Sequence, residues 1–135
     1  MDRGQDWDKV LTVDARFTET GHLPRGLASY VRTAWEQVRE RLAERSDGGV
    51  LFLHDAGLVG RYASAGGQEL LVALQAAARS PAAAPHGLWL LCPGDSAAAT
   101  PHLDKLMVEV TEASERLVLD GDFLDGLRRS IGGAA

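Results

Sequence analysis

The sequence predicts an α/β domain: a three-layer sandwich with a mainly parallel sheet, in the order β-α-β-α-β followed by a short β-β-α. Two apolar runs, 50–53 (VLFL) and 88–91 (LWLL), have the length and composition of strands that are buried on both faces. Segments with helical periodicity lie before and between these runs. Strands that alternate with helices form parallel sheets through right-handed crossovers, with helices on both faces.

The first predicted strand lies within 9–16 (KVLTVDAR), because its valines and leucine favour extended structure, and Asp14 falls near its end. Segment 17–26 (FTETGHLPRG) contains glycine, proline and threonine, which predicts a loop. A helix follows from about Leu27, because apolar residues recur at spacings of three and four while charged residues fill the other face. The segment SDGG (46–49) ends this helix.

The second strand, 50–53, is followed by a loop or short helical turn at 57–67 (GLVGRYASAGG) and by a second helix at 68–80. After the third strand, the alternating segments 107–110 (MVEV) and 116–119 (RLVL) predict two short strands that form a hairpin or a turn into a last strand. A short final helix is predicted at 122–130.

The length of 135 residues suits a single domain, so 1–135 is predicted to be one α/β unit, with flexible ends at 1–8 and 131–135. Both ends resemble the edges of a cut, which favours a fragment of a larger protein. The net charge of −5 argues against a general nucleic-acid binder or a binder of anionic membranes. A single cysteine, Cys92, and the lack of an apolar signal segment or membrane span predict a cytoplasmic protein.

Asp14 and Asp55 are the candidate catalytic residues, because each follows a predicted strand and ligands bind at the carboxyl ends of parallel strands. A carboxylate there can hold Mg²⁺ or act as a general base, which makes Asp55 the candidate metal ligand. The alternative is that each aspartate opens a loop or caps a helix. His54 is expected to point away from Asp55, because neighbouring side chains of a strand face opposite sides.

The remaining motifs predict neither a metal site nor a cofactor site. The four histidines lack metal-ligand spacing, and the chain contains neither GxxxxGK[ST] nor GxGxxG. Cys92 is expected to be a thiol at the edge of the core, because no base or positive setting is evident nearby. Trp35 lies outside the main apolar stripe of its helix. It is therefore either a side chain packed under a loop or an exposed anchor for a partner protein.

Two segments, VLFLHDAG (50–57) and LWLLCPGD (88–95), resemble the second half of a P-loop ATPase core, where one strand ends in a metal-side aspartate and the next carries a sensor residue. Ala56 stands where many such ATPases place a catalytic glutamate, and the phosphate loop is missing. The resemblance therefore implies Mg²⁺ and ATP only if an upstream phosphate loop completes the site.

A closer resemblance covers about residues 27–119 and rests on LASYVRTAW, VLFLHDAGLVGRY and GLWLLCPGDSAAATPHLD followed by VEV. The chain is similar there to the C-terminal region of large bacterial phage-defence proteins of the phage growth limitation (BREX) systems, which include serine/threonine kinase-type proteins. The kinase signatures HRD and DFG are absent from these residues.

This resemblance implies a non-catalytic domain that docks other domains or components of a defence system, without direct binding of nucleic acid or membrane. The alternative is an ATPase-like or metal-dependent phosphoryl-transfer or hydrolase domain that uses acidic residues at the strand ends. Whether the chain forms homo-oligomers is left open.

Overall fold

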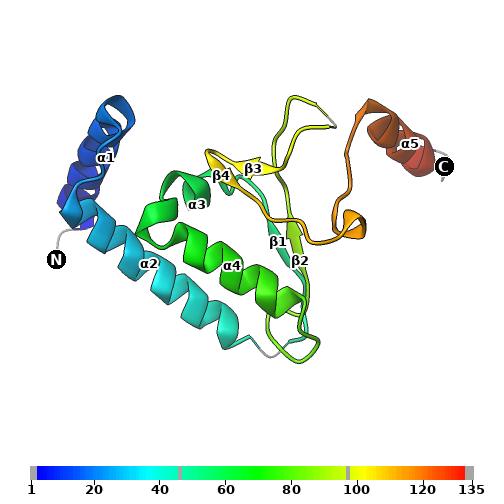
Figure 1. Cartoon of the computed structure of the whole chain (residues 1–135), viewed down its shortest axis with the longest axis horizontal. Helices are drawn as coiled ribbons and strands as arrows, with labels where there is room; N and C mark the ends of the chain where they lie inside the picture. The colour runs from blue at the N-terminus through cyan, green and yellow to red at the C-terminus, as the bar shows by residue number, and fades with distance from the viewer. Residues whose placement is uncertain (1–2, 46, 97, 133–135) are drawn as a thin grey trace.

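The computed structural model describes residues 3–45, 47–96 and 98–132, with five α-helices and four short strands in this part of the chain (Figure 1). In chain order the elements are α1 (Arg3–Thr20), α2 (Arg25–Ala43), β1 (Leu51–Leu53), α3 (Gly57–Arg61), α4 (Gly67–Ala78), β2 (Leu88–Leu90), β3 (His102–Leu103), β4 (Leu106–Met107) and α5 (Gly121–Gly132). Two 3-10 turns, η1 (Ala63–Ala65) and η2 (Ala113–Glu115), complete the set. No helix in the described ranges is long and apolar enough to cross a membrane.

The mixed helix–sheet class is confirmed, and β1 and β2 pair in parallel as the sequence predicts. Their register places Phe52 opposite Trp89. The strands β3 and β4 form a separate antiparallel pair. The three-layer sandwich is not confirmed, because α4 covers one face of the β1–β2 sheet while Phe52 and Trp89 on the other face are each 58% exposed.

The predicted strand at 9–16 is wrong, because these residues lie within the helix α1. Val10, Val13 and Phe17 recur at spacings of three and four, and all three pack against the cluster that contains Leu27 of α2. Tertiary packing therefore overrides the strand preference of the valines. The helix continues to Thr20, so the predicted loop at 17–26 shrinks to the four residues before α2.

The helices predicted after Leu27 and at 68–80 are confirmed as α2 and α4. The loop or short helical turn predicted at 57–67, between β1 and α4, is α3 followed by η1. Of the two alternatives for 107–110 and 116–119, the hairpin between them is not formed, and residues 116–119 form no strand that could be the last one. Met107 pairs with His102 instead, through a tight turn in which Asp104 has a φ of 52°. Aspartate tolerates this left-handed conformation better than most residues, although the sequence lacks the usual Asn-Gly or Asp-Gly signal.

The end segments predicted to be flexible, 1–8 and 131–135, extend outside the described residues. The backbone of residues 3–8 belongs to α1, and that of 131–132 to α5.

The core consists of two hydrophobic clusters. The first joins α2 to the segment after α3 and contains Leu27, Val31, Tyr62 and Ala65. The second joins α3, α4 and the β3–β4 pair and contains Val59, Leu71, Leu103 and Val108. Cys92 is half-buried against this second cluster, as expected of a thiol at the core edge, and burial raises the pKa of its thiol.

A close backbone contact joins α3 to β3. A Cβ atom built on Gly60 would lie 1.6 Å from the carbonyl oxygen of Leu103, which is itself 1% exposed. Only glycine allows the helix to approach β3 this closely, because that oxygen belongs to the backbone and cannot rotate away. The second cluster therefore depends on a glycine at position 60.

Gly60→Ala should lower the free energy of unfolding by about 1–3 kcal/mol or more, because the added methyl group forces α3 away from β3. Gly57→Ala is the matched control in the same helix, since a Cβ at Gly57 has no atom within 4 Å. Urea denaturation of both variants provides the measurement. Equal midpoints for the two variants would contradict this account of the contact.

Candidate functional site

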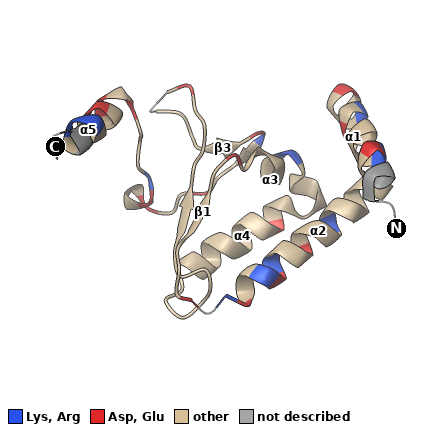
Figure 2. Cartoon of the chain, turned by 180° about the vertical axis from the view of Figure 1, so that it is seen from behind, with Lys and Arg blue, Asp and Glu red and all other residues tan. Residues whose placement is uncertain are grey.

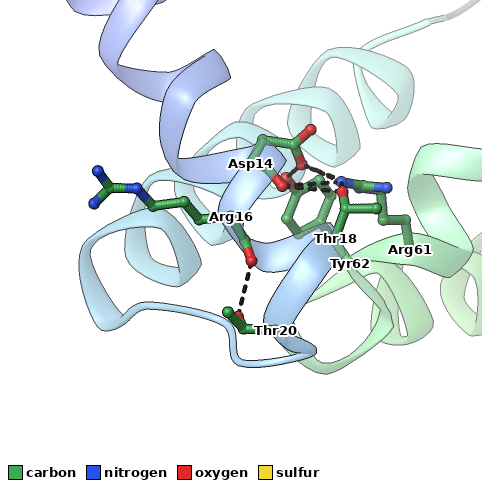
Figure 3. Close-up of polar contacts among 6 residues, drawn as sticks. All are labelled: Asp14, Arg16, Thr18, Thr20, Arg61 and Tyr62. Atoms are coloured by element: carbon green, nitrogen blue, oxygen red, sulfur yellow. Dashed lines mark hydrogen bonds and ion pairs between the residues drawn. The ribbon is translucent and has the colours of Figure 1, made fainter.

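Asp14, predicted to follow a strand, lies in the middle of α1 and binds Arg61 and Tyr62 (Figure 3). The Nε of Arg61 donates a hydrogen bond to its carboxylate at 3.0 Å, and another guanidinium nitrogen lies 2.9 Å from the same oxygen. The hydroxyl of Tyr62 donates to this oxygen as well. Burial, together with this hydrogen bond, raises the pKa of Tyr62. The prediction that Asp14 lies at the sheet rim is therefore wrong, and its carboxylate attaches α1 to α3.

Asp14→Asn should destabilise the chain by about 1–3 kcal/mol, because it weakens a charge-assisted hydrogen bond in a part-buried position. The exposed Asp8 of α1 provides the control, and Asp8→Asn should leave stability nearly unchanged. Thermal unfolding followed by circular dichroism measures both. If the two variants melt together, Asp14 does not hold α1 in place.

Asp55 lies at the carboxyl end of β1, as predicted, in the connection to α3. Its side chain is 94% exposed, and its φ is 52°. The expectation that His54 points away from Asp55 is wrong, since the Nδ1 of His54 lies 2.9 Å from a carboxylate oxygen of Asp55. Strand alternation does not apply here, because β1 ends at Leu53 and the positive φ of Asp55 turns the chain.

The structure does not bring Asp14 and Asp55 into one site, because Asp14 belongs to the α1–α3 contact and Asp55 to the end of β1. In the described portions of the chain, no group of three or more His, Cys, Asp and Glu side chains is arranged to hold a metal ion. The candidate roles of Asp55 in catalysis and metal binding stay predictions. Its position also suits the simpler alternative of a residue that opens a loop.

Trp35 is half-buried and packs against both hydrophobic clusters. A Cβ on Gly66 would lie 3.4 Å from its Cδ1, so the ring lies close under the turn before α4. Its indole Nε1 is buried, with no hydrogen-bond partner among the described residues. This geometry matches the expectation of a side chain packed under a loop. The role of Trp35 as an anchor for a partner stays a prediction.

The outer face of the β1–β2 sheet is an exposed apolar surface that two paired strands build together. We call it the sheet face, and it consists of Val50, Phe52, Trp89 and Leu91, with exposed fractions of 55, 58, 58 and 41%. These residues share one side, because Phe52 is in register with Trp89 and the others lie two positions away on the same segments. The ring of His54 stacks on Phe52, with centroids 5.7 Å apart.

Sequence reasoning missed the sheet face, because a continuously apolar run predicts burial on both faces. The available signal was the presence of one large aromatic residue in each of the two apolar runs, Phe52 and Trp89. Aromatic residues are enriched at protein interfaces as well as in cores. The arrangement can bind a complementary apolar surface.

Comparisons with known proteins identify one curated relative. The chain is 36% identical over 107 residues to "Probable kinase PglW" of Streptomyces coelicolor, in a match that covers 76% of this chain. The chain spans only about 6% of the length of that relative. No family model matches the chain, and no solved structure matches it. The similarity therefore relates this chain to a small segment of PglW.

Proposed function

We propose that this chain is a non-catalytic docking domain of a bacterial phage-defence protein of the phage growth limitation (BREX) type. The sheet face is its docking surface, and its partners are other domains or components of the defence system in the cytoplasm. The similarity to PglW supports the phage-defence context. The observation that carries the docking role is the exposure of Phe52 and Trp89 side by side on a parallel sheet.

The physical argument concerns the free energy of burial. Strands of parallel sheets normally have both faces covered, and here one face remains open to solvent. Covering apolar surface stabilises by about 25 cal/mol per Å², so a partner surface of matching shape gains free energy on this face. Trp and other large aromatic residues also dominate binding hot spots.

A non-catalytic role agrees with the sequence and with the position of Asp14. The chain lacks the kinase signatures HRD and DFG, so the kinase activity that the name of the relative indicates has no signature in these residues. The alternative function, metal-dependent phosphoryl transfer, requires the carboxylates of Asp14 and Asp55 together at the strand ends. One of them, Asp14, instead binds Arg61 in the contact between α1 and α3.

The test is the double variant Phe52→Ser/Trp89→Ser, expressed from the natural gene in bacteria that carry the complete defence system. We expect loss of phage restriction, measured as efficiency of plating, with the protein level unchanged. Tyr30→Ser is the matched control, since Tyr30 is 54% exposed on α2, away from the sheet face. Full restriction in the double variant would overturn the docking role.

A further inference from the structure

A second exposed apolar surface lies at the C-terminal end of the described chain. We call it the arm; it comprises residues 116–132, which include α5. Three consecutive apolar residues precede the helix, and three more lie on it: Leu117, Val118, Leu119, Phe123, Leu124 and Leu127, with exposed fractions between 39 and 57%. In α5 the apolar residues share one side and the charged residues the other, which is the pattern of a helix that packs against a surface.

The start of the arm is fixed to the body of the molecule. Arg79, just after α4, donates two hydrogen bonds of 2.8 Å to the carboxylate of Glu115, and this pairing holds the pKa of Glu115 at about 2. Arg116 donates to the carbonyl of Ala99 at 2.7 Å. Val118 still lines a hollow together with Pro101 and Val108 of the body. Beyond Val118 the chain leaves the body, and Figures 1 and 2 show α5 set apart from the other helices.

The sheet face and the arm are complementary in kind. One is a sheet face that lacks a covering helix, and the other is a helix with an apolar side that lacks a sheet. Helix-on-sheet packing is the standard way to bury both surfaces, and it would add the layer that the predicted three-layer sandwich requires.

We propose that the arm of one copy of this chain covers the sheet face of a second copy, and that the second copy returns the same contact. This exchange forms a closed dimer with twofold symmetry, in which each copy contributes both surfaces. The inference rests on the proposed function and narrows it, because among the components of the defence system it names a second copy of this chain as the partner on the sheet face.

The available area supports a reciprocal contact. Large aromatic side chains bury about 150–250 Å² each, so Phe52 and Trp89 at 58% exposure offer roughly 100–150 Å² apiece. Val50 and Leu91 on the sheet face and the six apolar residues of the arm add further area. One contact between arm and sheet face therefore covers roughly 600 Å², and two contacts cover roughly 1,200 Å². A stable interface buries about 1,200–2,000 Å². Two reciprocal contacts therefore reach the size that a stable dimer needs, whereas one contact alone supports only a weaker, transient pair.

The experiment measures self-association of the chain by sedimentation velocity, with one variant on each surface. The arm variant is Leu124→Ser/Leu127→Ser, the sheet variant is Phe52→Ser/Trp89→Ser, and Tyr30→Ser is the control. We expect the wild type and the control to sediment at twice the monomer mass of 14.4 kDa at micromolar concentration. Each double variant should be monomeric, with self-association weakened roughly 100-fold or more. Circular dichroism should show that both remain folded, because the changed side chains lie outside the two core clusters.

Mixing the two double variants makes the decisive measurement. A mixed pair retains one intact contact, between the arm of the sheet variant and the sheet face of the arm variant. Heterodimers should therefore appear in the mixture at higher protein concentrations than the wild type needs, while each variant alone stays monomeric at those concentrations. A monomeric wild type, or a mixture that stays monomeric, overturns the exchange. Folding of the arm onto its own sheet face gives the first of these results. A contact between two sheet faces, or between two arms, leaves one of the double variants dimeric, and that result overturns the exchange as well. If the wild type is monomeric and the sheet variant still loses phage restriction, the dimer is wrong and the docking role of the sheet face is retained.

Discussion

The indole of Trp35 lies against both hydrophobic clusters, and the rest of the architecture depends on this contact. On one side, α2 holds α1 through Val10, Val13 and Phe17. On the other side, the same tryptophan reaches the cluster that supports the sheet. The turn before α4 fits over the ring because Gly66 adopts a φ of 102°, which favours glycine. Trp35 thus links the helical end of the molecule to the β1–β2 sheet, whose outer face we propose as the docking surface.

This link makes the two faces of the β1–β2 sheet unequal. The inner face is joined through Leu90 to the second cluster and is held by the close approach of α3 to β3. The outer face contributes nothing to either cluster. Its residues therefore stay exposed while the two clusters hold the inner face in place.

Periodicity alone predicted the helices α2 and α4, and the apolar runs predicted the parallel pair β1–β2. The strand expected at 9–16 was wrong. Valines in a short run fit a strand by composition and a helix by spacing, and only their packing against α2 selects the helix. The sheet face was missed for a related reason. The apolar runs VLFL and LWLL indicate strands, but their composition does not show whether both faces of those strands are buried within the chain. Asp14 was assigned to the rim of the sheet because it was expected at the end of a strand, whereas it lies within α1. The positive φ of Asp55 was not predicted from the sequence.

The position of Cys92 has a consequence for measuring the molecule. It is the single cysteine of the chain, it lies half-buried beside the second cluster, and burial raises its pKa. Thiol reagents attack the thiolate, so they react slowly while the cluster is closed and faster in any state that opens it. The rate at which a thiol reagent labels the native chain thus measures how often the second cluster opens, without an introduced probe.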